Sequence, residues 1–250
     1  MVRVVLDIRK SVEENAAAYF EKAKKARKKL EGVDKTIALA KERLLEKERA
    51  ATQQQRTFRR EWYHAFRWFY SSDGFLVLAG KDADTNERLV KKQLEKQDII
   101  FHTDMPGSPF VLVKKGQSAP EQTIAEASSF TASLSRAWKK ELGEAEVYWV
   151  LPDQVTKETK AGEYITKGSF MVYGKRNYVT APMDLAIGVS EKWGVMLGPM
   201  VAVKRHCSRE VQLKQSADVP GQLARKIARF LHVEIDAVSK VLPANARADL

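Results

Sequence analysis

The chain has very little cysteine: Cys207 is the only one among 250 residues. A single cysteine cannot build a disulfide framework or a thiolate zinc site within the chain, which favours a reducing, intracellular setting. No stretch approaches the roughly 18 apolar residues that a membrane span needs, and the start MVRVVLDIRKSVEENA lacks the apolar core of a secretory signal. We therefore expect a cytosolic, cytoplasmic protein with no membrane partner.

The sequence also lacks recognisable catalytic and cofactor motifs. Neither GxxxxGK[ST] nor GxGxxG occurs, which argues against a nucleotide-driven motor. The four histidines are scattered without the spacing of metal ligands, and adjacency of His206 and Cys207 does not suit a nucleophile with its base. The sequence predicts no metal, no cofactor and no catalytic residue, so we do not expect an enzyme.

Positive charge is abundant but unevenly distributed. The formal net charge is +11 and the pI is about 9.6, which favours an anionic partner such as nucleic acid. Basic residues exceed acidic ones by 8 in residues 1–60 and by 4 in residues 200–250, whereas residues 61–199 carry a slight acidic excess of 1. These segments are expected to be an arm, a globular domain and a C-terminal extension.

Residues 11–60 contain no proline and one glycine, and they are rich in good helix formers. Ser11 and Glu14 have capping-box spacing, which places a helix start here. Apolar residues then recur at steps of three and four, which predicts a coiled-coil helix about 75 Å long whose partner helix comes from outside the sequence or from a second copy. Its lysines can contact phosphates or simply be solvated, and both interpretations stay open. The apolar positions are Ala16, Tyr19, Ala23, Ala26, Leu30, Val33, Ile37, Ala40 and Leu44.

A change in composition at Glu61 begins the globular domain, for which we predict an α+β fold: a mixed sheet with helices packed on it. Two apolar runs around Asp73-Gly74 predict a hairpin over residues 68–80. The other expected elements are helices over 84–95 and 123–140 and strands over 99–102, 110–114, 147–151, 169–173 and 186–189. Residues 200–250 are expected to form a small helical appendage that begins with a basic strand from Lys204. A turn at Pro220-Gly221, helices over 222–231 and 235–241, and disordered last residues should follow.

Some polar groups suggest nucleic-acid contacts. His102, Asp104 and the turn 106–108 can hold a phosphate through backbone amides and the Ser108 hydroxyl, with Lys114 nearby, or they can form a purely structural turn. Tyrosines between the later basic residues suit base stacking, although aromatic residues in strands are more often core.

Four strings resemble the RNA-binding domain of the NFACT family. Residues 61–77, EWYHAFRWFYSSDGFLV, resemble the family's W-F-x-S-S-x-G-x-L-V opening, and DADTNE at 82–87 resembles its D-A-x-x-N-E helix start. HTDMPGSP at 102–109 is similar to the H-A-D-x-x-G-x-P loop, with Thr103 in place of the usual Ala. GEYITKGSFM at 162–171 is similar to G-E-Y-x-x-x-G-S-F-M. The first twenty residues echo the family's L-D-x-x-S-x-x-x-N-A-x-x-Y-F entry into its middle coiled coil.

The resemblance implies an RNA-binding, ribosome-docking fragment with a middle coiled coil (1–60), an NFACT RNA-binding-type domain (61–199) and an extension (200–250) of archaeal type, without the preceding amino-terminal NFACT domain. The full factor would act on large ribosomal subunits obstructed by peptidyl-tRNA and recruit tRNA for C-terminal tailing of the stalled peptide. The implied partners are large-subunit rRNA and tRNA. The candidate nucleic-acid-binding residues are Lys22, Lys25, Lys29, Arg67, Lys81, His102, Ser108, Lys114, Lys167, Lys175 and Arg176.

Two other functional classes stay open from the sequence. An RNA-processing enzyme would use His102 and Asp104 as acid and base groups. A protein-interaction module would dock a ribosomal protein or a ligase through the coiled coil, whose exposed seam also favours a homodimer.

Overall fold

A computed structural model describes residues 4–54, 61–158, 166–216 and 220–250. The chain divides into two compact units, residues 1–55 and 56–250. The predicted end of the first helix at residue 60 and the first residues of the 162–171 string lie outside the described residues. No described helix is long and apolar enough to cross a membrane.

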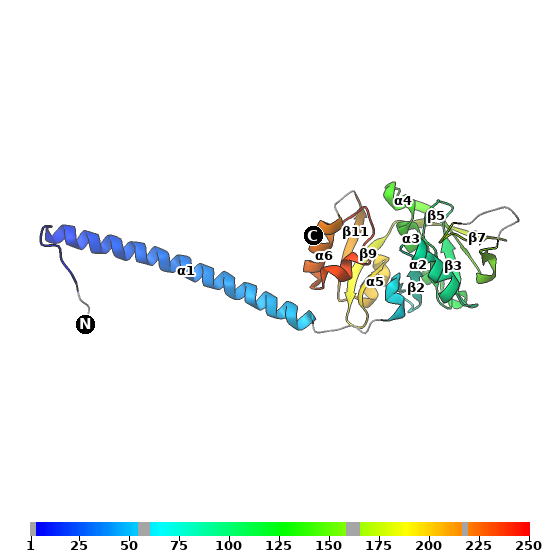
Figure 1. Cartoon of the computed structure of the whole chain (residues 1–250), viewed down its shortest axis with the longest axis horizontal. Helices are drawn as coiled ribbons and strands as arrows, with labels where there is room; N and C mark the ends of the chain where they lie inside the picture. The colour runs from blue at the N-terminus through cyan, green and yellow to red at the C-terminus, as the bar shows by residue number, and fades with distance from the viewer. Residues whose placement is uncertain (1–3, 55–60, 159–165, 217–219) are drawn as a thin grey trace. The chain divides into compact units, whose positions relative to one another are not determined.

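The first unit contains one continuous helix, α1 (Val12–Gln54), drawn in blue to cyan in Figure 1. The predicted capping box is confirmed: the Glu14 amide donates to Ser11 Oγ at 3.2 Å, and the Ser11 amide donates to the Glu14 carboxylate at 2.8 Å. Asn15 folds the preceding segment back, because its side chain accepts from the Asp7 amide at 2.9 Å and donates to the Asp7 carbonyl at 3.0 Å. The entry motif is therefore a helix-start device.

The apolar seam of α1 faces solvent. Leu30, Val33 and Ile37 are 61, 52 and 46% exposed, and Tyr19 also remains on the surface. At about 1.5 Å per residue, the 43 residues of α1 extend for roughly 65 Å. The long helix is thus confirmed, whereas its pairing in a coiled coil stays a prediction.

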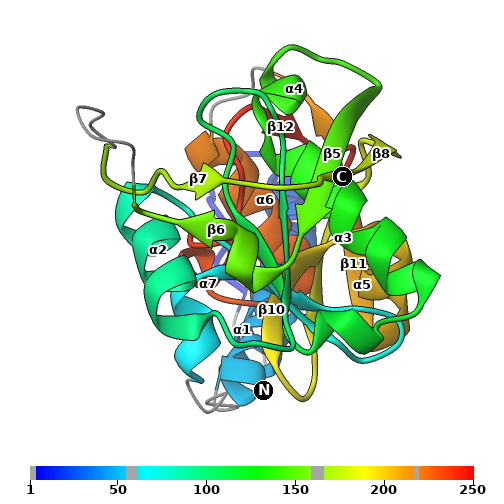
Figure 2. The ribbon, with the colours of Figure 1, turned by 90° about the vertical axis from the view of Figure 1, so that its right-hand side faces the viewer.

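The second unit begins with a six-stranded sheet in the order β1-β2-β4-β3-β5-β8. All of its strand pairs are antiparallel, so the α+β fold is as predicted but the expected mixed sheet is wrong. The predicted hairpin is confirmed, and Gly74 supplies the positive φ of +87° in its turn. Helix α3 (Glu121–Leu134) packs against this sheet, mainly on β8 and β5, and Figure 2 shows these elements from the right-hand side of Figure 1. The strands are β1 (Arg67–Tyr70), β2 (Leu76–Ala79), β3 (Ile99–His102), β4 (Val111–Val113), β5 (Glu144–Val150) and β8 (Asn177–Pro182).

A second sheet has the order β10-β9-β11-β12, and it corrects the predicted appendage. Strands β9 (Leu185–Ser190) and β10 (Gly194–Gly198) lie before residue 200, yet β11 (Arg209–Gln215) pairs directly with β9. The final strand, β12 (Ala246–Arg247), pairs with β11, and Ala246 is buried, so the expected disorder of the last residues is also wrong. Residues 200–250 are part of the compact unit because their apolar side chains complete its second sheet.

Contact between β1 and β10 joins the two sheets in one core. The Phe69 side chain is fully buried, and its ring lies edge-on to that of Phe130 in α3, with 4.8 Å between the centroids. Gly198 packs so closely that an added Cβ would lie 2.7 Å from the Phe69 ring. Glycine is required at this position because the strand backbone itself contacts the aromatic ring.

Several predicted elements differ in extent. The helix expected over 84–95 is α2 (Ala83–Arg88) followed by a π-helical turn, Leu89–Gln93. The helix expected over 123–140 breaks at Ser135, whose extended backbone ends α3 and whose hydroxyl caps α4 (Arg136–Lys139). The strand expected over 169–173 shortens to β7 (Met171–Val172), paired with β6 (Val155–Thr156). Short 3-10 turns cover Trp62–Ala65, Gly116–Ser118 and Pro152–Gln154.

The helices after β10 are α5 (Met200–His206), α6 (Pro220–Leu231) and α7 (Ile235–Ser239). Helices α6 and α7 confirm the helices expected over 222–231 and 235–241. The expected basic strand is confirmed as β11, although it begins at Arg209 because Lys204 to His206 belong to α5. Pro220 starts α6 rather than forming a separate turn, as suits a residue without a backbone N–H.

Candidate nucleic-acid interface

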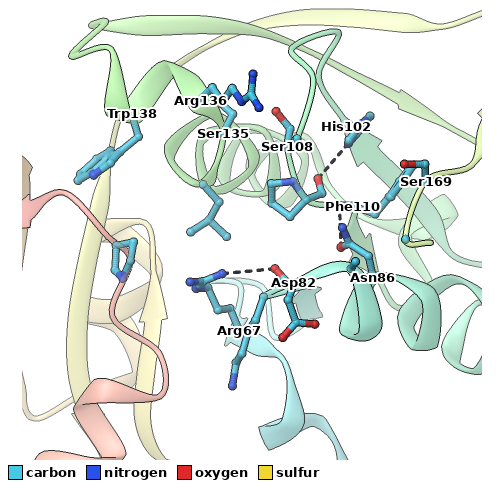
Figure 3. A pocket seen from close by; sticks show the side chains of 18 of the residues that line it. Arg67, Asp82, Asn86, His102, Ser108, Phe110, Ser135, Arg136, Trp138 and Ser169 are labelled. Carbon is cyan, nitrogen blue, oxygen red and sulfur yellow. Dashed lines mark hydrogen bonds between the residues drawn. The ribbon is translucent and has the colours of Figure 1, made fainter. Parts of the chain in front are cut away.

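Six separate segments of the second unit surround one cavity of about 540 Å³. They are the start of β1, the β2–α2 junction, the loop between β3 and β4, the α3–α4 junction, the segment before β7 and the residues before β12. Figure 3 shows Arg67 and Arg136 on different sides of this space. Five basic residues line it, namely Arg67, Lys81, Arg136, Lys139 and Lys167, together with one carboxylate, Asp82.

Arg67 projects from β1 into the cavity wall. Its Nε donates to the Val241 carbonyl at 3.3 Å and its Nη1 to the Gly80 carbonyl at 3.4 Å, the latter drawn dashed in Figure 3. Burial lowers the pKa of the guanidinium, although the nearby Asp82 charge opposes that shift. The cation is thus held by neutral carbonyl oxygens rather than by a paired carboxylate.

Lys81 follows β2 and lies beside Arg67. Burial is the largest cause of its lowered pKa, and repulsion by the Arg67 and Lys240 charges adds to it. The neighbouring Asp82 carboxylate caps α2, because it accepts from the Thr85 amide at 2.8 Å and from the Thr85 hydroxyl at 2.9 Å. Those donors hold the pKa of Asp82 below its ordinary value. Positive charge therefore dominates this side of the cavity.

The sequence prediction missed Arg136 and Lys139, which stand exposed at the cavity rim on α4. The Arg136 guanidinium lies over Gly107, where an added Cβ would be 3.3 Å from its Nε. Both residues were placed inside one continuous predicted helix, so the sequence did not indicate that both side chains face the cavity. The available signal was Ser135, a residue type that favours a new helix N-terminus.

Backbone glycines shape two other walls. An added Cβ at Gly80 would lie 1.8 Å from Asn86 Oδ1, which accepts from the Phe110 amide. Gly168 has a φ of +79°, and its Cβ would lie 2.6 Å from the Ala83 backbone. Lys167, just before it, forms an ion pair with Asp84 at 2.5 Å, and burial plays little part because both side chains are exposed. Lys167 therefore lines the cavity as a partly neutralised cation.

The loop between β3 and β4 is internally bonded. His102 Nδ1 donates to the Pro109 carbonyl at 3.0 Å, its ring stacks on Phe110 with 4.2 Å between centroids, and burial lowers its pKa. Ser108 Oγ donates to the Met105 carbonyl at 2.9 Å and lies 2.6 Å from Thr103 Oγ1. Both His102 and Ser108 line the cavity, yet the Ser108 hydroxyl is engaged within the turn, as the structural-turn interpretation expected.

Three candidates lie away from the cavity within the same unit. Arg176 donates to Asp104 at 2.6 Å and lies over the Tyr148 ring at 4.6 Å, while Lys175 is exposed next to it. The Asp104 carboxylate also accepts from the Tyr178 hydroxyl, and its charge opposes the lowering of the His102 pKa by burial. Lys22, Lys25 and Lys29 are exposed on α1 in the other unit.

Lys114 is the third predicted candidate that lies away from the cavity, and it takes part in a buried ion pair. Its Nζ lies 2.8 Å from the Asp98 carboxylate and donates to the Gln93 carbonyl at 2.7 Å. Asp98 is fully buried and also accepts from the backbone amides of Glu95 and Lys115 at 2.8 Å each. The cation neutralises a buried charge, so its position serves the fold rather than a ligand.

We expect Lys114→Met to lower the free energy of unfolding by about 3–5 kcal/mol, because it leaves the Asp98 charge buried without its partner. RNA affinity of the folded fraction should stay at the wild-type value. Urea unfolding and RNA titration of the same preparation test both parts. A stable variant with weakened RNA binding would contradict this assignment and return Lys114 to the interface.

No group of three or more histidine, cysteine, aspartate or glutamate side chains among the described residues is placed to hold a metal ion. Burial raises the pKa of the Cys207 thiol to about 12, which is unlike an activated nucleophile.

Comparison with known proteins shows which proteins this chain resembles. Residues 65–174, which supply most of the cavity, match the NFACT protein RNA binding domain. A protein of Methanocaldococcus jannaschii named archaeal Rqc2 homolog aRqcH is 38% identical over 206 residues, or 78% of this chain. The chain belongs to the NFACT family.

Animal relatives extend the similarity. The NEMF homolog of Drosophila melanogaster, named a ribosome quality control complex subunit, is 38% identical over 52% of this NFACT chain. Human NEMF, with the same type of name, is 33% identical over 70% of it. The chain spans 31% of the length of the archaeal relative and 13 and 17% of the two animal ones.

Proposed function

We propose that this NFACT chain binds RNA as part of a ribosome quality-control factor. The finer proposal is that the whole factor acts on large subunits obstructed by peptidyl-tRNA and recruits tRNA for C-terminal tailing of the stalled peptide. The matched domain and the names of the relatives support the quality-control role. Large-subunit rRNA and tRNA are the expected partners in the cytoplasm.

The observation that carries the proposal is the set of cations around one cavity. Arg67, Lys81, Arg136 and Lys139 come from three separate segments, and none has a carboxylate in hydrogen-bond contact among the described residues. Unpaired cations gathered at one place are suited to phosphate oxygens, which they bind through charge-assisted hydrogen bonds. The lysines of α1 would add sequence-independent contacts.

A salt titration tests RNA binding. Fluorescence anisotropy with labelled tRNA and with rRNA fragments should give a linear fall of log affinity with log salt, with a slope of about −0.9 for each phosphate contacted in a duplex. An affinity that hardly responds to salt would instead favour the protein-docking alternative. RNA cut during incubation with the purified chain would point to the processing enzyme.

The exposed seam of α1 favours a second, additional role as a pairing surface. Leu30, Val33 and Ile37 lie in heptad register and are exposed, which suits a second copy or a helix of a ribosomal protein or ligase. We expect the chain to self-associate at tens of micromolar, and Leu30→Lys with Val33→Lys to abolish this by charging the seam. Light scattering measures the mass. A monomeric wild-type chain would argue against the homodimer.

A further inference from the structure

Arg67 and Lys81 form a partly buried basic pair in the cavity, and neither has a carboxylate in hydrogen-bond contact among the described residues. The guanidinium has five N–H donors, of which two go to the carbonyls of Val241 and Gly80. The Arg67 and Lys240 charges repel Lys81, and only the single Asp82 charge attracts it. The nearby Asp82 carboxylate is already bonded to Thr85. Two partly buried cations side by side are costly unless an anion binds between them.

The cavity also has the dimensions of a small-ligand site. Its volume of about 540 Å³ falls within the range of about 300–1,000 Å³ that is usual for pockets holding one small molecule. Pro243 and Ala244 form one wall, and the Val241 carbonyl holds Arg67 in place. These residues lie outside the matched range 65–174.

We propose that Arg67 and Lys81 bind the terminal phosphate of an RNA strand. This inference rests on the proposed RNA-binding function and names the group that the cavity recognises. A terminal phosphomonoester carries close to two negative charges at neutral pH, whereas each internal diester carries one. The remaining donors of Arg67 can form a planar fork to two phosphate oxygens, and Lys81 supplies the second charge.

The competing explanation is that Arg67 is purely structural. Its two carbonyl contacts tie the residues after β2 to the segment after α7, and this alone would justify a buried arginine. That explanation gives the phosphate no role, so affinity would not depend on the chemistry of the strand end. The two explanations therefore differ in whether RNA affinity depends on a phosphate at the strand end.

The experiment uses the full chain and one short single-stranded RNA sequence made with a 5′-phosphate, with a 3′-phosphate or with hydroxyls at both ends. We expect one phosphorylated form to bind about tenfold or more tightly than the hydroxyl form, because hydrogen bonds to charged groups are strong. Lys81→Met and Arg67→Lys should reduce this preference severalfold, since the first removes a charge and the second removes the fork. Lys92→Met, an exposed lysine away from the cavity, is the matched control and should keep the preference.

Each outcome separates the inference from the function on which it rests. Equal affinity for phosphorylated and hydroxyl RNA overturns the terminal-phosphate site while leaving RNA binding intact. Failure to bind any RNA overturns the proposed function. If a nucleoside monophosphate or inorganic phosphate binds as tightly as the phosphorylated strand, the ligand is a free phosphate compound rather than RNA. If Arg67→Lys does not fold, the Lys81→Met result decides alone.

Discussion

Arg136→Ala combined with Lys139→Ala is expected to weaken RNA binding by roughly 10- to 100-fold, because each cation can make a charge-assisted hydrogen bond to phosphate. Both side chains are exposed at the cavity rim, so the fold should tolerate their removal. The slope of log affinity against log salt should become less steep by about two, one unit for each phosphate that is no longer neutralised. Fluorescence anisotropy over a range of salt concentrations measures both quantities.

The matched control removes the same charge elsewhere. Lys92 and Lys96 are exposed, lie near the end of the π-helical turn and do not line the cavity. Lys92→Ala with Lys96→Ala should leave the salt slope unchanged. If the two double variants weaken binding equally, RNA responds only to net charge, and the cavity rim has no special part in the interface.

Phe69→Ala is expected to lower the free energy of unfolding by about 3–5 kcal/mol, the usual cost of deleting a buried phenylalanine side chain. The effect should lie at the upper end, because this ring contacts Phe130 of α3 and the Gly198 backbone of β10 at the junction of the two sheets. Urea or thermal unfolding followed by circular dichroism measures the change.

Phe230→Ala provides the control for Phe69→Ala. Phe230 lies on α6 and is 47% exposed, so its removal should change stability by no more than about 0.5 kcal/mol. If Phe69→Ala also lies within that range, the two sheets do not share one core, and the proposed junction at Gly198 is wrong.

Local sequence patterns were sufficient to predict the elements whose hydrogen bonds form between residues that are close in the sequence. The Ser11 and Glu14 spacing placed the start of α1, and Asp73-Gly74 placed the β1–β2 turn, because each signal is completed within a few residues. The β3 strand was predicted at its observed bounds for a similar reason, as a short apolar run. The family resemblance followed from the order of such strings.

Elements that depend on distant partners were predicted poorly. β12 is two residues long and has no recognisable pattern of its own; its pairing with β11 and the burial of Ala246 define it. β8 alternates weakly, and its pairing with β5 and its contact with α3 define it. The break at Ser135 was missed because helix-forming residues continue on both sides.

The candidate site shows the same division. Basic and polar residues could be named as candidates from the sequence. Five of the eleven named residues line the cavity: Arg67, Lys81, His102, Ser108 and Lys167. Their environments could not be read: Lys114 is a partner for the buried Asp98, and the Ser108 hydroxyl belongs to a turn. Arg136 and Lys139 were not among the candidates because Ser135, the one local signal for a new helix start, was placed inside a single predicted helix.

The sequence by itself determined the long helix, the α+β character and membership of the NFACT family, since these depend on local propensity, on apolar spacing and on the order of short strings. Only the tertiary structure decided that residues 200–250 complete a sheet and that cations from distant segments share one cavity. The physical reason is that backbone pairing between distant strands, and the balance between buried charges, depend on neighbours in space that sequence separation does not reveal.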